Sequence, residues 1–247
     1  MPLDSSHVLV SERETLDRDG VVCLRKLLQP EDIEILLDEI ADYIERVVPR
    51  LDHRMMSYEP SPEGKGVIRG LFWMNAHCEF FRELAHDSRL SSLVSSIVDW
   101  EPVPHYVEYF AKSPRIGAAL HVHQDAPTAF IEPPHSVVLW IALDPANVNN
   151  GGVHFYQGSH KLGVLSHNYA HDWYLTLEDT RVLDNRQPVC FELEPGDATA
   201  HLSTTVHFSD DNRSAAPRRG LAVAYRSARS IVDERRYQQL MGIAWPT

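Results

Sequence analysis

The 247-residue sequence has few of the features that mark secreted or membrane proteins. Its three cysteines, Cys23, Cys78 and Cys190, are far apart, odd in number and form no CxxC pair, so they cannot build a disulfide framework. No run approaches the ~18 apolar residues that are needed to span a membrane. Charged residues come too early and too often at the N-terminus for a signal peptide. We therefore expect a cytoplasmic protein that does not contact the membrane.

Positive charge is also scarce. The formal net charge is −12, and no Lys/Arg run is longer than the pairs Arg218-Arg219 and Arg235-Arg236. A protein that binds phosphate groups needs a basic face. The composition therefore argues against a nucleic-acid partner and gives no basic cluster for the phosphates of coenzyme A. The 14 histidines, in contrast, suggest metal or proton chemistry without establishing either.

The order of hydrophobic patterns predicts a single domain over residues 1–247 that is mainly β, with N-terminal helices. Residues 1–100 form a helix-rich part in which Pro30 opens an amphipathic helix, since apolar residues follow at three- and four-residue spacing. Residues 51–70, rich in proline and glycine, are expected to be a loop, and residues 72–97 to be helical. Residues 101–230 contain short β-rich runs typical of an antiparallel sandwich or barrel. Residues 231–247 are expected to be a C-terminal tail.

One His-x-Asp pair lies where it could hold a metal ion. A non-haem iron oxygenase needs three protein ligands on one face of the metal. His123 and Asp125 close a strand-like run, and side chains at i and i+2 share a strand face. The only other match, His77-x-Glu79, falls in the predicted helix, where i and i+2 point about 200° apart. The context therefore favours His123 and Asp125, with a second histidine from elsewhere in the sheet.

His121 competes for this site because it shares the strand face of His123. Its distance from Asp125 along a strand would be about 13 Å, too far for one ion, so we expect it to line the pocket. Other candidates for contact with a substrate are polar or aromatic residues near the same strands, although each aromatic could equally pack in the core: Tyr106, Tyr109, Thr128, Phe130, Trp173 and Tyr174.

Beyond this pair, an ordered set of short motifs resembles the phytanoyl-CoA dioxygenase family from about Asp17 to Arg226. Each motif alone is weak, but together and in this order they are specific. They are His123-Gln124-Asp125, Trp140-Ile141-Ala142-Leu143-Asp144, Asn150-Gly151-Gly152, Gly158-Ser159-His160-Lys161, Pro195-Gly196-Asp197, His207, Asn212-Arg213-Ser214 and Pro217-Arg218.

The resemblance implies a double-stranded β-helix, the cupin-like jelly roll, with Fe(II), O2 and 2-oxoglutarate as co-substrate. By this resemblance the metal ligands are His123, Asp125 and His207. The residues at the co-substrate are Arg218, which would bind its far carboxylate, Ser209, which would touch the same carboxylate, and Trp140. A planar guanidinium makes two parallel bonds to a carboxylate that lysine cannot reproduce.

Two of these assignments have rivals in the sequence. His201 lies near the same strand region as His207, and only the family spacing to Asn212 and Arg218 favours His207. Arg219 is adjacent to Arg218, and for Arg219 we expect a solvated charge at a strand edge. The sequence departs from the family pattern at Gln157, where proline is common, and at Asn149, where an acidic residue is common.

The expected function is therefore an Fe(II)- and 2-oxoglutarate-dependent dioxygenase of natural-product or specialised metabolism. Related halogenases lack the carboxylate, so Asp125 favours hydroxylation, or a desaturation, cyclisation or epimerisation that starts with the same hydrogen abstraction. We expect a small-molecule substrate rather than an acyl-CoA, and a monomer or homodimer. The alternatives are a cupin-type metalloenzyme that does not use 2-oxoglutarate and a non-catalytic binding protein of the same fold.

Overall fold

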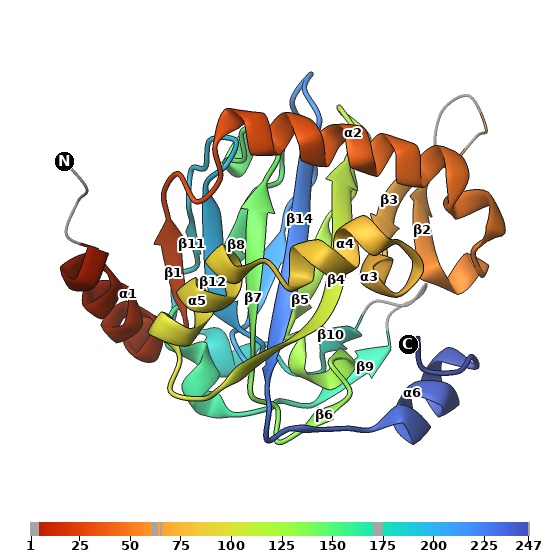
Figure 1. The fold of residues 1–247 in the computed structure, drawn as a ribbon. Coiled ribbons are helices and arrows are strands. Elements are labelled where there is room, and N and C mark those ends of the chain that lie inside the picture. Colours follow the sequence, from red (N-terminus) through yellow and green to blue (C-terminus); the bar gives the residue numbers. More distant parts are fainter. Residues whose placement is uncertain (1–4, 61–63, 65, 170–174, 247) are drawn as a thin grey trace.

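Two antiparallel sheets face each other in the computed structural model, which describes residues 5–60, 64, 66–169 and 175–246 (Figure 1). The larger sheet has the order β1-β12-β7-β14-β4-β3-β2 and the smaller one β11-β8-β13-β5. In that order the larger sheet contains β1 (Val21–Leu24), β12 (Ala198–Leu202), β7 (Ser136–Ala142), β14 (Arg218–Ser227), β4 (Pro102–Lys112), β3 (Val67–Leu71) and β2 (Met56–Glu59). The smaller sheet contains β11 (Val189–Cys190), β8 (Val153–Phe155), β13 (His207–Ser209) and β5 (Leu120–His123). The jelly-roll fold and its antiparallel pairing are as predicted.

The remaining elements are helices and two short strand pairs. The strand pairs are β9 (His167–Tyr169) with β10 (Leu175–Leu177), and β6 (Ile131–Glu132) with β15 (Ile231–Val232). The α-helices are α1 (Ser5–Asp19), α2 (Pro30–Arg46), α3 (Met74–His77), α4 (Glu79–Ala85), α5 (Ser88–Ile97) and α6 (Glu234–Met241). Among the described residues, no helix is both long and apolar enough to cross a bilayer.

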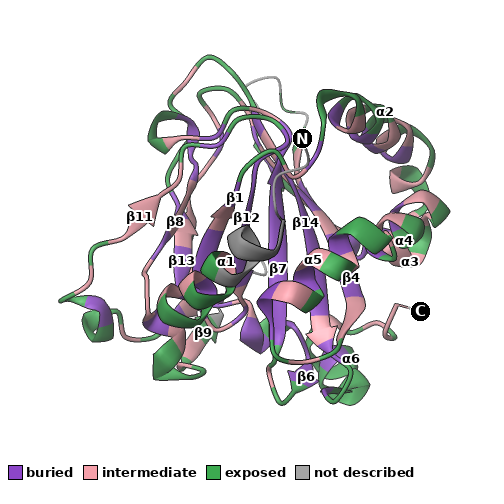
Figure 2. Ribbon diagram, turned by 60° about the vertical axis from the view of Figure 1, so that its left-hand side comes forward, coloured by how far each residue is buried: buried purple, intermediate pink, exposed green. Residues whose placement is uncertain are grey.

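The N-terminal helices cover one face of the larger sheet, and the site lies on its other face. Figure 1 shows α2, α4 and α5 over this sheet, and Figure 2 shows their outer faces exposed while the central strands are buried. Alternate residues of β14 divide between the two sides: Leu221 and Val223 pack under the helices, whereas Ala222 and Ala224 face the opposite side. The sheet therefore separates a large apolar core from the cavity.

The helix α2 has the start and the buried stripe that its sequence predicts. Pro30 occupies the first turn, and Gln29 with Asp32 forms a capping box. Ile33, Leu36, Ile40 and Tyr43 are buried and recur at three- and four-residue spacing, which places them on one face of the helix.

Two predictions for the N-terminal part were wrong. Residues 51–70 are not only loop, because β2 and β3 form a hairpin that extends the larger sheet beyond β4. Residues 72–97 form three helices instead of one, since Cys78 adopts an extended conformation and the Asp87 side chain accepts backbone N–H groups at the start of α5. His77 and Glu79 consequently lie on different helices, so the helical argument against this pair does not apply; no metal-binding group in the described part of the chain includes them.

The C-terminal segment is more ordered than a tail. It contains β15 and α6, and the ring of Tyr237 is fully buried against Trp73 and Phe130. Trp245 contacts the same rings edge to face, with its ring centroid 4.5 Å from that of Trp73. Both Trp73 and Phe130 line the cavity, so this segment supports the cavity wall.

Candidate active site

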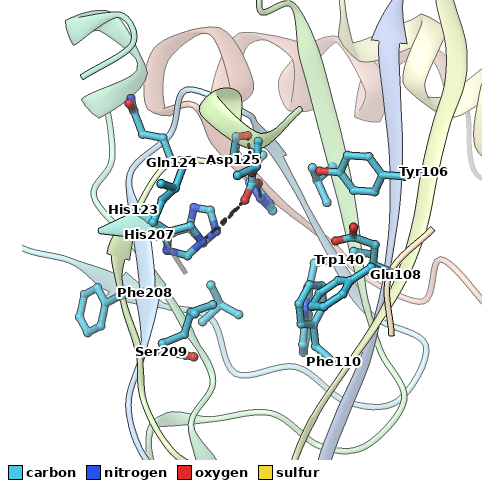
Figure 3. Close-up of a pocket in the computed structure, with 18 of the residues that line it drawn as sticks. Tyr106, Glu108, Phe110, His123, Gln124, Asp125, Trp140, His207, Phe208 and Ser209 are labelled. Carbon is cyan, nitrogen blue, oxygen red and sulfur yellow. Dashed lines mark hydrogen bonds and ion pairs between the residues drawn. The ribbon is translucent and has the colours of Figure 1, made fainter. Parts of the chain in front are cut away.

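Two neighbouring strands of the smaller sheet bring three possible metal ligands together. His207 on β13 is paired in register with His123 on β5, and Asp125 follows two residues later (Figure 3). One Asp125 carboxylate oxygen, Oδ1, lies 3.7 Å from Nε2 of His123 and 3.5 Å from Nε2 of His207. The three ligand atoms all fall within 4.8 Å of one another. One small cation can therefore contact all three side chains.

The hydrogen bonds of the two imidazoles fix which nitrogen faces the shared space. Nδ1 of His123 lies 2.7 Å from the His121 carbonyl, and Nδ1 of His207 lies 3.0 Å from the Thr205 carbonyl. A carbonyl only accepts, so each Nδ1 carries the proton and donates it. Each Nε2 then holds a free lone pair directed at the other ligands, which is the tautomer that a metal ion requires.

The protonation states also suit a divalent cation. Burial lowers the pKa of His207 to about 3 and lowers that of His123, so both rings are neutral at physiological pH. Burial alone would raise the pKa of Asp125, but its electrostatic interaction with His207 and the hydrogen bond from His201 outweigh this effect and lower the pKa. Two neutral imidazoles and one carboxylate form the facial set typical of non-haem Fe(II), so the residues present fit that metal.

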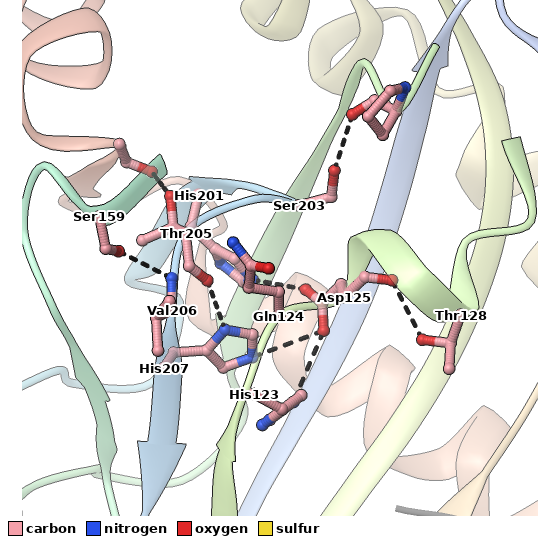
Figure 4. A network of polar contacts seen from close by, with 12 residues as sticks. His123, Gln124, Asp125, Thr128, Ser159, His201, Ser203, Thr205, Val206 and His207 are labelled. Carbon is pink, nitrogen blue, oxygen red and sulfur yellow. Dashed lines mark hydrogen bonds and ion pairs between the residues drawn. The ribbon is translucent and has the colours of Figure 1, made fainter. Parts of the chain in front are cut away.

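His201 orients the carboxylate and does not join the ligand group. Its Nε2 donates to Oδ2 of Asp125 at 3.0 Å, which leaves Oδ1 for the side of His123 and His207 (Figure 4). The group of three ligand atoms includes His207 and not His201. The structure thus places the two rival histidines in different positions, one facing the shared space and one behind the carboxylate.

Gln124 lies between the ligands His123 and Asp125 and stabilises the turn that follows β5. Its side-chain amide donates to the carbonyls of Gly163 and Thr204 and accepts the Leu165 N–H, and its backbone N–H donates to His167 Nε2. The Gln124 side chain points away from those of Asp125 and His207 (Figure 3).

The Gly-Ser-His motif has a structural position next to the distal histidine. Ser159 is buried, and its hydroxyl oxygen accepts the N–H of Val206, the residue before His207. His160 hydrogen-bonds through Nε2 to the Asp17 carbonyl in α1. These bonds tie the loop after β8 to β13 and to the N-terminal helix.

At the other end of the cavity lies a buried guanidinium, that of Arg218, which feels the charge of Glu59 but forms no ion pair among the described residues. Arg218 is 3% exposed, and within the described residues its Nε has no hydrogen-bond partner and its guanidinium makes no ion pair. Burial lowers its pKa only to about 10, so it stays charged. It lies 5.2 Å from the Trp140 ring centre, and a Cβ at Gly220 would overlap this ring. A buried cation costs stability unless an anion compensates it, so Arg218 is suited to a carboxylate ligand.

The other predicted co-substrate residues surround the same region. Ser209 is buried and lines the cavity, as does Trp140. Arg219, expected to be solvated, is instead partly buried in an ion pair with Asp144 at 2.7 Å. Its side chain points away from the cavity, because adjacent residues of a strand face opposite sides. The two neighbouring arginines therefore lie on opposite faces of β14.

The predicted substrate residues divide between the cavity and other places. Tyr106, Thr128 and Phe130 line it. Tyr109 does not: it is separated from Tyr106 by an odd number of positions on β4 and packs in the core under the helices. His121 is exposed and does not line the cavity either, so its predicted pocket role was wrong. Trp173 and Tyr174 lie outside the described residues.

Several cavity residues were not predicted from the sequence. They share one face of β4 or lie opposite it, and include Glu108, Phe110, Lys112, Arg69, Phe72 and Phe208. A two-residue alternation counted from Tyr106 would have identified the first three. Burial lowers the pKa of Lys112 to about 7, and Lys112 is paired in register with Arg218.

Comparison with known proteins agrees with this fold. Curated relatives include a phytanoyl-CoA dioxygenase of Arabidopsis thaliana, 29% identical over 139 residues, which are 56% of this chain and 49% of that protein. The mouse phytanoyl-CoA dioxygenase domain-containing protein 1 is 37% identical over 92 residues, 37% of this chain and 32% of that protein. The matches thus span about half of these relatives or less.

Solved structures show the same fold. The epimerase SnoN, in complex with Fe3+, α-ketoglutarate and nogalamycin RO, superposes with a TM-score of 0.75 at 22% identity over 92% of this chain and 86% of SnoN. EctD from S. alaskensis, with 2-oxoglutarate and 5-hydroxyectoine, gives 0.73 at 19% identity over 92% and 79%. The sequence profile of the family described as Phytanoyl-CoA dioxygenase (PhyH) matches residues 16–220, and the chain therefore belongs to that family.

Proposed function

We propose that the protein is a non-haem Fe(II)- and 2-oxoglutarate-dependent dioxygenase that oxidises a C–H bond of a small metabolite in natural-product or specialised metabolism. One observation carries the proposal. A His-Asp-His group that can hold a divalent cation lines the same cavity as a buried guanidinium that forms no ion pair within the described part of the chain. A metal ligand set alone would suit many enzymes, but this combination suits a co-substrate with a chelating end and a carboxylate end.

In this proposal His123, Asp125 and His207 hold the iron, and Arg218 with Ser209 binds the far carboxylate of 2-oxoglutarate. Ser209 lies two residues beyond His207 on β13, hence on the same strand face and roughly 7 Å away. This separation suits a five-carbon diacid that chelates the metal through its keto-acid end. When bound, iron and 2-oxoglutarate supply O2 activation, with succinate and carbon dioxide as the co-substrate's products.

The protein's own residues position and shield this chemistry. His201 holds the Asp125 carboxylate so that one oxygen faces the metal position. Aromatic side chains line much of the cavity and limit water around the reacting groups. SnoN and EctD, which share the fold, were crystallised with α-ketoglutarate or 2-oxoglutarate, and this supports the same co-substrate here.

Anaerobic addition of Fe(II) and then 2-oxoglutarate tests the proposal. We expect the weak visible charge-transfer band of the chelated keto acid in the wild-type protein and its loss in Asp125→Ala. Succinate release, followed while candidate metabolites are added in air, would then identify the substrate. The proposal would be wrong if 2-oxoglutarate produced no band and did not stabilise the protein against unfolding. A metalloenzyme that does not use this co-substrate would then be the better assignment.

A further inference from the structure

A carboxyl group faces the cavity from the larger sheet. Glu108 lies on β4 between Tyr106 and Phe110, and all three line the cavity because alternate residues share a strand face. Figure 3 shows the Glu108 carboxyl directed into the cavity, across from Asp125 and His207. Within the described part of the chain, no hydrogen bond or ion pair joins this carboxyl to another residue.

Glu108 is distinct from the residues proposed for the metal and the co-substrate. Lys112, which is paired in register with Arg218, is four residues further along β4, roughly 13 Å away. Among the described residues, the charged side chain that acts appreciably on Glu108 is Asp125, another acid. The positive charges of Lys112 and Arg218 therefore do not compensate the charge that the Glu108 carboxyl carries when it is ionised.

The surroundings of this carboxyl leave room for a ligand and are rich in aromatic rings. Its register partner on β14 is Ala222, and the next residue across the sheet, on β7, is Trp140. The small alanine leaves space between the carboxyl and the indole ring. Phe72 and Trp73 complete the aromatic lining of the cavity. Ring faces attract cations, so an ammonium group is stabilised here by both kinds of neighbour.

We propose that Glu108 binds a protonated amine of the substrate, which places the substrate class among small amines with an apolar body. This inference rests on the proposed function, which places the reaction at the metal ligands. The C–H bond that is oxidised would then lie between the bound amine and these ligands. A hydroxyl group could also hydrogen-bond to Glu108, but only a cation would favour the ionised form of this half-buried carboxyl over its protonated form.

The electrostatics of the cavity lining agree with this assignment. Burial, followed by the repulsion from Asp125, raises the pKa of Glu108 to about 8. A cation placed beside the carboxyl favours its ionised form and opposes both effects. An ammonium ligand and Glu108 therefore stabilise each other's charged states.

Three probes that share one skeleton test the inference: 3-phenylpropylamine, 3-phenylpropan-1-ol and 3-phenylpropanoate. Their binding is measured by calorimetry under anaerobic conditions to the protein loaded with Fe(II) and 2-oxoglutarate. We expect the wild-type protein to bind the amine about 10-fold or more tightly than the alcohol, and the carboxylate most weakly. Glu108→Gln should remove this preference, whereas Glu101→Gln, at an exposed acid just before β4, should retain it.

The co-substrate band separates failure of this inference from failure of the proposed function. If the band forms in the wild-type protein and in Glu108→Gln, the cavity is intact and the probe results apply to Glu108 alone. Equal binding of the amine and the alcohol, no binding of any probe, or an amine preference that survives in Glu108→Gln would overturn the inference. Absence of the band from the wild-type protein would instead overturn the proposed function.

Discussion

Replacement of Arg218 by lysine should weaken 2-oxoglutarate binding while the metal site stays intact. The guanidinium is buried, carries its charge and has no ion pair among the described residues, so its whole hydrogen-bonding capacity is available to a carboxylate. Arg218→Lys keeps the charge but loses one of two parallel charge-assisted bonds. Such a bond contributes about 1.5–3 kcal/mol, which corresponds to an about 10- to 150-fold increase in Kd.

Arg218→Met should have a larger effect, because it leaves the carboxylate of the co-substrate buried without its partner. Loss of one member of a buried pair costs about 3–5 kcal/mol, or about 100-fold or more in Kd. Lys112, which lines the same cavity, limits this loss if its amine can reach the carboxylate.

The assay is an anaerobic titration of 2-oxoglutarate into the Fe(II)-loaded protein, read from the visible band. Arg219→Lys is the matched control: Arg219 pairs with Asp144, its side chain is 35% exposed, and we expect less than about a threefold change. A wild-type Kd in Arg218→Lys, or an equal loss in Arg219→Lys, would refute the assignment of the co-substrate carboxylate to Arg218.

Three further predictions follow from the packing and the charges. Burial lowers the pKa of His105 to about 4, so the folded state resists protonation of this ring and becomes less stable as the pH drops below about 6.5. The free energy of unfolding in urea therefore falls between about pH 7.5 and about pH 5, and His105→Gln should make this fall smaller by about 2 kcal/mol. A fall of the wild-type size in His105→Gln would contradict the prediction. Gly220→Ala should lower the melting temperature, since the new methyl group overlaps the Trp140 ring and overpacking costs about 1–3 kcal/mol; wild-type melting would show that the indole moves freely. His201→Asn should weaken Fe(II) binding about 10- to 100-fold by releasing Oδ2 of Asp125, which competition with a chelator measures; unchanged affinity would mean that the hydrogen bond does not position the carboxylate.

The local chemistry of the metal ligands is readable from the sequence, and their meeting in space is not. The i, i+2 spacing of His123 and Asp125 at a strand end predicts that they converge. No local sequence pattern predicts that His207 lies opposite His123 on the neighbouring strand. The family resemblance supplied that distal ligand, and His201 remained a rival until the structure placed it behind the carboxylate.

Errors arose where tertiary packing decides the outcome. Tyr109 looked like a pocket residue because of its type and position, but strand alternation turns it under the helices. The β2–β3 hairpin was missed since its strands are short and its connection is rich in proline and glycine. Tyr237 belongs to a segment that resembles a polar tail in sequence, and its burial depends on the rings of Trp73, just before α3, and Phe130, just before β6.

The iron content of the protein tests the central claim most directly. After anaerobic loading with Fe(II) and desalting, we predict one iron per chain in the wild-type protein and far less in His207→Ala and in Asp125→Ala. His160→Ala is the control, since this histidine lies away from the group of three ligands and should leave the iron content unchanged. Retention of one iron per chain in His207→Ala would contradict the assignment of His123, Asp125 and His207 as the metal site.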